Sequence, residues 1–211
     1  MVDATNPMVQ GLLKAEAYAE RPATVSLAQT HISYLFFTGK HVYKVRKPVN
    51  FGFLDFTTLE RRRLDCHREV ELNRRLSPEI YLGVVEICEE AGQYSVEGPG
   101  KTVEYAVKMR QLPREASMKK LLRRNALTPD TVRRVAALVA DFHSHAQTSP
   151  EITRLGGWET VEQNVQENFD QTAKYIGATI TPEVYDDLRA YSEAFLDVRH
   201  SAFEQRAREG R

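Results

Sequence analysis

The stretch from Ala23 to Pro48 constrains the fold most, because strand-favouring residues dominate it. It contains three runs rich in β-branched and aromatic residues, ATVSLAQ, HISYLFFTG and KHVYKVRKP. Gly39 and Lys40, between the last two runs, are typical of a tight turn. We therefore predict an antiparallel meander in this part of the chain.

The segments on either side of the meander predict an α+β protein. Asn6 followed by Pro7 is typical of a helix start, and that helix is expected to end at Arg21 and Pro22. A second helix is predicted from about Leu59 to Leu76, capped by Thr57 or Thr58. Residues 81–113 then predict more strands, with turns at Gly92 and at 98–100. Together these segments predict a sheet of about five strands with one inserted helix.

The rest of the chain has a helical pattern, and its last helix carries a regular apolar repeat. That helix is expected to begin at Thr181 and Pro182. Its apolar residues alternate by four and three, which predicts a seam that packs on other helices; they are Val184, Leu188, Tyr191, Phe195, Val198 and Ala202. We expect three parts: an N-terminal helix over 1–22, a strand-rich lobe with its exit strand over 23–112, and a helical part over 113–211.

The charge balance excludes a general attraction to anionic surfaces, because 29 basic and 29 acidic residues cancel. Residues 40–75 nevertheless hold ten Lys or Arg against five Asp or Glu. This local excess fits an anionic partner or a solvated helix face. Nucleic acid is disfavoured, because Arg61, Arg62 and Arg63 spread around a helix and no stacking aromatics interleave with them.

Two isolated cysteines, Cys66 and Cys88, form no disulfide or zinc pattern, so we expect reduced thiols in a cytoplasmic protein. The N-terminal segment carries Asp3, Glu16 and Glu20 without an unbroken apolar core, which disfavours a signal peptide. No stretch approaches the roughly 20 apolar residues of a membrane span. We expect no membrane partner.

Lys44 interrupts a strand in which an apolar residue would be ordinary. Because side chains alternate along a strand, Val42, Lys44 and Arg46 share one face. An apolar residue two positions before a lysine suits a nucleotide site, where the ammonium reaches the phosphates. The alternative is an edge-strand lysine extended into solvent. A lysine on the concave face needs a carboxylate partner, and Glu69 and Glu71 in the next helix are the candidates.

The run THISYLFFTGKHVYKVRKPVNFGFLDFTTLERRRLDCHREVELNRRLSPEIYLGVV, from Thr30 to Val85, resembles the N-terminal half of bacterial aminoglycoside-phosphotransferase-like proteins. It is most similar to the branch that often carries a C-terminal P-loop ATPase domain. The resemblance implies a protein-kinase-like N-lobe followed by a partial, all-helical C-lobe. The function it implies is ATP-dependent phosphoryl transfer to a small hydroxylated acceptor, which the sequence does not identify.

The same resemblance assigns roles to single residues. Lys44 takes the place of the phosphate-binding lysine, and Glu69 that of its ion-pair partner. Glu71 is less suitable, because two residues along a helix are separated by about 200°. The QTHIS stretch stands where kinases have a glycine-rich loop, but it has no glycine, so Thr30, His31 and Ser33 are the candidates there. The base would lie against Val42, Met109 and the hinge residues Arg110, Gln111 and Leu112.

The chain departs from the family in having no H-G-D-x-x-x-x-N pattern and no later metal-binding aspartate. We therefore expect an ATP-binding portion that ends before the catalytic loop, is inactive alone, and binds Mg²⁺ only with the missing C-terminal part. No catalytic or metal-binding residue is assigned. One alternative is a non-catalytic nucleotide-sensing or interaction module, in which the 184–202 seam mediates self-association or contacts a C-terminal domain. A second is nucleic-acid binding through residues 40–75.

Overall fold

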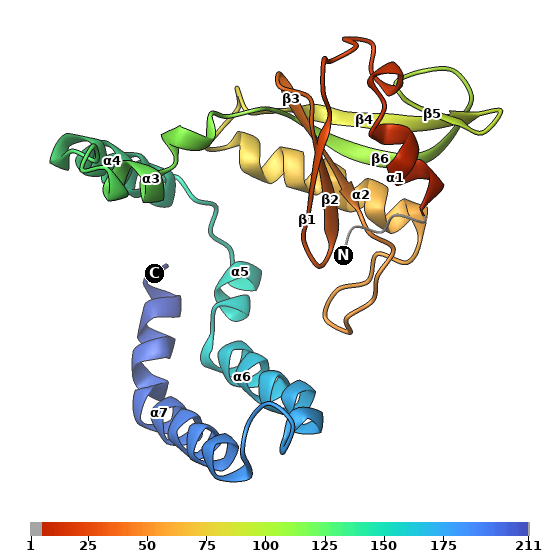
Figure 1. Cartoon of the computed structure of the whole chain (residues 1–211). Helices are drawn as coiled ribbons and strands as arrows, with labels where there is room; N and C mark the ends of the chain where they lie inside the picture. The colour runs from red at the N-terminus through yellow and green to blue at the C-terminus, as the bar shows by residue number, and fades with distance from the viewer. Residues whose placement is uncertain (1–5, 211) are drawn as a thin grey trace. The chain divides into compact units, whose positions relative to one another are not determined.

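The structure, a computed structural model, describes residues 6–210 and has the α+β architecture expected from the sequence (Figure 1). The chain forms two compact units, one ending at Val135 and the other beginning at Ala136. The first unit contains the sheet and the second contains helices. Each unit is described separately below.

One antiparallel sheet of six strands forms the centre of the first unit (Figure 1). The strands lie in the order β1-β2-β3-β6-β4-β5. They are β1 (Ser26–Gln29), β2 (Ser33–Phe37), β3 (His41–Arg46), β4 (Tyr81–Glu90), β5 (Gln93–Val96) and β6 (Lys101–Arg110). The predicted meander is confirmed as β1 to β3. The sheet has six strands where about five were predicted, because the short β5 pairs with β4 along its whole length.

Other elements cover both faces of the sheet. Successive side chains of β3 point alternately to one face and to the other. Tyr43 and Val45 belong to an apolar core that they share with α1 (Pro7–Leu12) and the 3-10 turn η1 (Ala15–Ala17). On the other face lies α2 (Leu59–Arg74), whose Cys66 and Val70 pack with Val107 of β6. Lys44 and Arg46 point toward α2, where they pair with Glu69.

The first helix is shorter than the sequence predicted. Asn6 caps it as expected, because its side chain accepts hydrogen bonds from the backbone N–H groups of Met8 and Val9. The helix ends at Leu12, whereas the prediction placed its end near Arg21. Lys14 is extended, and the hydroxyl of Tyr18 donates to the Leu12 carbonyl oxygen at 2.6 Å. That bond satisfies a carbonyl that a longer helix would have used. Residues 1–5 of the predicted N-terminal segment lie outside the described residues.

The helix α2 begins and ends close to the predicted positions. Thr58 is its N-cap, and its hydroxyl accepts from the backbone N–H of Arg61 at 3.3 Å. Cys66 is fully buried and Val70 is 6% exposed, so the helix rests on the sheet through a narrow apolar strip. At the C-terminal end, Arg74 donates to the carbonyl oxygen of Tyr81 at 2.7 Å and also to that of Leu82. These bonds attach the end of α2 to the start of β4.

Helices follow the sheet through the rest of the chain. They are η2 (Arg114–Ala116), α3 (Met118–Arg123), α4 (Pro129–Ser144), α5 (Pro150–Leu155), α6 (Trp158–Thr172), η3 (Ala173–Tyr175) and α7 (Pro182–Arg208). In the second unit α6 packs on α7 through Tyr185 and Leu196 of α7. The Tyr185 hydroxyl donates to the Phe169 carbonyl at 2.8 Å, and the Trp158 indole donates to the Leu196 carbonyl at 3.3 Å. Among residues 6–210, no helix combines the length and apolar character that a membrane crossing needs.

Candidate functional site

The strand β3 and the helix α2 bring Lys44 and Glu69 together. The Lys44 ammonium lies 2.8 Å from Glu69 Oε1, so the predicted pairing of these two side chains is confirmed. Glu71 is exposed and takes no part in the pair. The Lys44 side chain is 24% exposed and that of Glu69 is 10% exposed. The carboxylate is thus nearly enclosed, while the lysine retains access to solvent.

Arg46 is the central residue of this site, and sequence reasoning did not assign it a role. Its Nη2 donates to Glu69 Oε2 at 2.5 Å, and its Nε donates to Asp65 Oδ2 at 2.6 Å. Its Nη1 donates to the Ser33 hydroxyl at 2.9 Å. Arg46 is 7% exposed, so one buried guanidinium joins β2, β3 and α2. The available signal was spacing: Lys44 and Arg46 lie two apart on a strand, and Asp65 and Glu69 lie four apart on a helix.

The charges of Lys44 and Arg46 balance those of Asp65 and Glu69, but the two cations do not use their N–H donors to the same extent. An ammonium has three N–H donors, and Lys44 makes one hydrogen bond, to Glu69. Arg46 uses each of its three nitrogens in a bond to a side chain. Because Arg46 also holds Glu69, the carboxylate keeps a cationic partner when Lys44 bonds elsewhere. Lys44 can therefore donate to an anion without leaving a buried carboxylate unpaired.

Apolar side chains lie beside Lys44 on the same face of the sheet. Val42 is 6% exposed and lies opposite Phe37 of β2 and Met109 of β6. The Arg114 guanidinium lies 5.7 Å from the centre of the Phe37 ring. Apolar side chains next to a lysine suit a ligand with one apolar end and one anionic end.

The predicted hinge residues leave the sheet beside the β2–β3 turn. The Arg110 N–H donates to the Ile80 carbonyl at 2.9 Å. The Gln111 N–H donates to the Lys40 carbonyl at 2.9 Å, and its side-chain oxygen accepts from the Gly39 N–H at 3.0 Å. Within the described residues the backbone N–H of Leu112 has no hydrogen-bond partner, and its side chain is 56% exposed. Of the three hinge N–H groups, that of Leu112 is the one available to a ligand.

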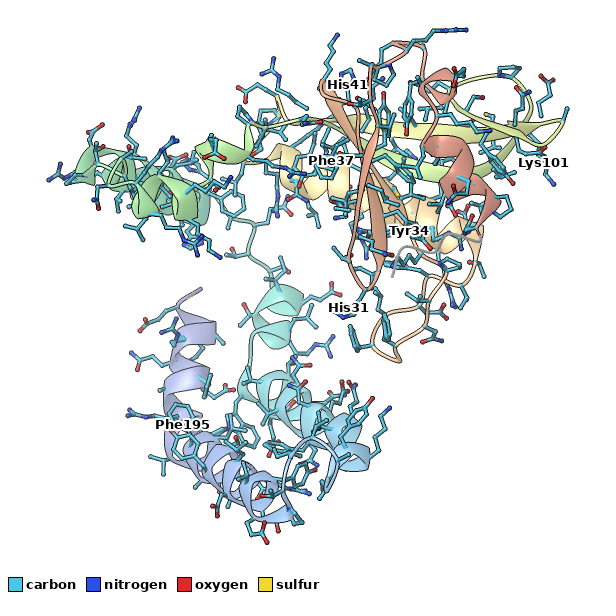
Figure 2. The ribbon with its side chains drawn as sticks, in the orientation of Figure 1. His31, Tyr34, Phe37, His41, Lys101 and Phe195 are labelled. Carbon is cyan, nitrogen blue, oxygen red and sulfur yellow. The ribbon has the colours of Figure 1, made fainter. Side chains whose placement is uncertain are left out.

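The predicted phosphate loop, Gln29–Ser33, is a closed turn between β1 and β2. The Thr30 N–H donates to the Ser33 carbonyl at 2.9 Å, and its hydroxyl accepts from the Ser33 N–H at 3.0 Å. Ser33 is fully buried and its hydroxyl accepts from Arg46, so that hydroxyl is engaged within the protein. His31 is exposed at the turn (Figure 2). The structure thus places His31 toward solvent and Ser33 in the interior.

The basic segment 40–75 is largely neutralised by its own surroundings. At least five of its ten cations form ion pairs, and these include Lys44, Arg46, Arg61, Arg62 and Arg63. The Arg62–Glu104 pair, at 2.8 Å, is buried on both sides. Lys47 donates to the Gln29 side chain and the Thr30 carbonyl. The segment therefore presents less free positive charge than its composition indicates.

Neither a cluster of metal-ligating side chains nor the two hollows described here adds to the site at Lys44. Between residues 6 and 210, no three or more His, Cys, Asp or Glu residues are grouped so that they could hold a metal ion. A hollow of about 590 Å³ lies between the 53–56 loop and the outer face of α2. Another, of about 460 Å³, lies between the first helical segment and the β4–β5 hairpin. Neither is lined by Lys44.

Comparisons with known proteins give relatives but no family. Uncharacterized protein Rv2004c of Mycobacterium tuberculosis (strain ATCC 25618 / H37Rv) and uncharacterized protein Mb2027c of Mycobacterium bovis are each 25% identical to this chain over 205 residues. Those residues are 97% of this chain and 39% of either relative, so the chain spans about two fifths of their length. No family model and no solved structure matches.

Proposed function

We propose that the sheet unit binds a nucleoside triphosphate, with Lys44 on its phosphates, as the ATP-binding portion of a small-molecule phosphotransferase with a protein-kinase-like N-lobe. The observation that carries this proposal is the Lys44–Glu69 pair, which joins the third strand of a meander to the helix that follows it. The strands that follow α2 and the exit of the chain at Gln111 support the layout that the resemblance implies. Phosphate oxygens would accept hydrogen bonds from the two N–H groups that Lys44 leaves unused.

The proposal places the base on the apolar surface of Val42 and Met109, with the free Leu112 N–H at its edge. Thr30 and His31 lie on the turn nearest the phosphates in this arrangement, while the engaged Ser33 hydroxyl has no part in it. No metal ligand or catalytic base is assigned to this chain. Binding is therefore the property to test, and turnover would need groups from beyond these residues.

The test compares thermal unfolding with ATP, with AMP and with a single-stranded oligonucleotide at two salt concentrations. A ligand at 100 times its dissociation constant should stabilise the protein by about 2.7 kcal/mol. We expect stabilisation by ATP, weaker stabilisation by AMP, and little salt dependence. Binding of the oligonucleotide that falls steeply with salt would support the nucleic-acid alternative instead.

The Lys44→Met variant should lose the ATP effect while remaining folded, because Arg46 still neutralises Glu69. Lys101→Met is the matched control, because this substitution removes the same charge. Lys101 is exposed and is the first residue of β6 (Figure 2). Its response to ATP should equal that of the wild type. An unchanged ATP response in Lys44→Met, or none in the wild type at millimolar ATP, would contradict the proposal.

A further inference from the structure

The inner side of α2 carries charged side chains where a helix packed on a sheet usually carries apolar ones. Its buried residues are Arg62, Cys66 and Val70, which follow one another at intervals of four, so the arginine takes the place of the next apolar residue in the strip. Leu64 and Leu72 are exposed and add little to the contact with the sheet. Polar contacts must therefore supply much of what holds α2 in place.

Arg62 is the centre of a buried set of contacts near the start of α2. Its Nε donates to Glu104 Oε2 of β6 at 2.8 Å, and both side chains are buried. Its Nη1 donates to the carbonyl oxygens of Phe56 at 2.8 Å and of Thr57 at 3.2 Å. The other carboxylate oxygen of Glu104 accepts from the Tyr105 N–H at 3.0 Å. These contacts, called the Arg62 clamp below, join β6, the loop before α2 and α2 itself.

Phe56 connects the Arg62 clamp to the site at Lys44. Its carbonyl oxygen accepts from Arg62, and the centre of its buried ring lies 5.3 Å from the guanidinium carbon of Arg46. Arg46 in turn donates to Glu69, which also accepts from Lys44. An unbroken series of contacts thus runs from the clamp to Lys44. Side chains packed and hydrogen-bonded in this way can couple two places energetically, and a double-mutant cycle measures the coupling.

The spacing along α2 explains what the clamp does for Glu69. Arg62 and Glu69 are seven residues apart, which is two turns, so they lie on the same side of the helix about 10.5 Å apart along its axis. Contacts at two such places fix both the rotation of the helix and its position along the sheet. The hydrogen bonds from Lys44 and Arg46 to Glu69 are 2.8 and 2.5 Å long, and such bonds tolerate little displacement.

We propose that Arg62 and Glu104 are positioning residues of the nucleotide site. They touch no ligand, and they hold α2 in the position from which Glu69 orients the Lys44 ammonium. This inference rests on the proposed function, because Lys44 serves a ligand only if the site binds nucleotide. The first of the two tests below needs no nucleotide, so the two proposals can fail separately.

The first test is a double-mutant cycle on the urea unfolding of the full chain, followed by circular dichroism of the strands. It compares the wild type, Glu104→Gln, Glu69→Gln and the chain with both substitutions. In the wild type, Glu69→Gln should raise the equilibrium constant for unfolding at least about tenfold, because it breaks nearly enclosed ion pairs. In the Glu104→Gln background the same substitution should have a much smaller effect, because Glu69 no longer meets its cations well.

Additivity is the result that would overturn the proposal. Substitutions this far apart that act independently multiply their effects on the unfolding constant. A double variant whose effect equals the product of the two single effects would show that the clamp does not position Glu69. Glu86→Gln is the matched control, because it removes the same charge from an exposed position on β4, and its effect should multiply with that of Glu69→Gln.

The second test separates positioning from stability. Arg62→Met combined with Glu104→Leu removes both charges, and replacing a buried ion pair by apolar residues is often neutral or stabilising. This chain should unfold no earlier than the wild type, yet its dissociation constant for ATP should be about tenfold higher. ATP affinity equal to that of the wild type would overturn the proposal. If the wild type itself binds no ATP, the nucleotide proposal fails, and the cycle alone decides whether the clamp positions Glu69.

Discussion

At the residue scale, Arg46 shows how one buried side chain can hold a site in place. It reaches two carboxylates and one hydroxyl across three elements. Strand alternation placed Lys44 toward the next helix, where Glu69 and Glu71 were the candidate partners, and the family resemblance favoured Glu69. The role of Arg46 could not be predicted, because Asp65 and Ser33 meet it only once β2, β3 and α2 have packed together. Strand alternation placed Arg46 on the correct face but gave no partner for it.

Loss of Arg46 should destabilise the sheet unit much more than loss of an exposed arginine. Arg46→Met leaves the nearly enclosed Glu69 with Lys44 as its one cation and leaves Asp65 without its partner. Breaking a buried pair in this way costs about 3–5 kcal/mol. Urea unfolding should show this loss. Arg61→Met, which removes an exposed arginine paired with Asp55, should cost less than about 1 kcal/mol. Similar losses in the two variants would contradict the role assigned to Arg46.

At the element scale, α2 rests on the sheet through few apolar residues, and Cys66 lies at the centre of that contact. The helix, and a cap at Thr57 or Thr58, could be predicted from the sequence, since capping is a local property of neighbouring residues. The early end of α1 could not, because it depends on the hydrogen bond from Tyr18 to the Leu12 carbonyl oxygen.

Alkylation of Cys66 should report the separation of α2 from the sheet. Burial raises the pKa of the Cys66 thiol to about 12, so at pH 8 only about one thiol in ten thousand would be ionised in the folded protein. In a Cys88→Ser background, which leaves Cys66 as the single thiol, iodoacetamide should label the native protein very slowly. The unfolded protein should be labelled at the rate of an ordinary cysteine. Fast labelling under native conditions would show that α2 opens readily.

At the scale of the whole molecule, the chain divides into a sheet unit and a helical unit. The change from strands to helices could be predicted from periodicity. Which face of α7 packs inward could not, because a second set of positions that includes Tyr185, Ser192 and Leu196 also repeats at helical spacing. Only the position of α6 decides between the two faces, and it leaves Val184, Leu188, Tyr191, Phe195 and Val198 of the predicted seam exposed.

The two units should unfold as separate transitions. Trp158 is the single tryptophan of the chain and lies in the helical unit, so its fluorescence follows that unit alone. Phe36 is fully buried in the sheet core, and Phe36→Ala should cost the sheet unit about 3–5 kcal/mol. In the Phe36→Ala variant, the unfolding transition followed by circular dichroism of the strands should move to a lower urea concentration. The midpoint of the transition followed by Trp158 fluorescence should stay unchanged. An equal shift of both midpoints would show one cooperative unit.

The closed β1–β2 turn has a consequence for the speed of the nucleotide binding proposed above. Besides the bonds between Thr30 and Ser33, the turn is held by Lys47, which reaches the Thr30 carbonyl at 2.8 Å. A loop already ordered in the free protein has little conformational entropy left to lose when a ligand arrives. Association should then be limited by diffusional encounter and not by the closing of a flap. We therefore expect a single kinetic phase whose observed rate rises linearly with ligand concentration.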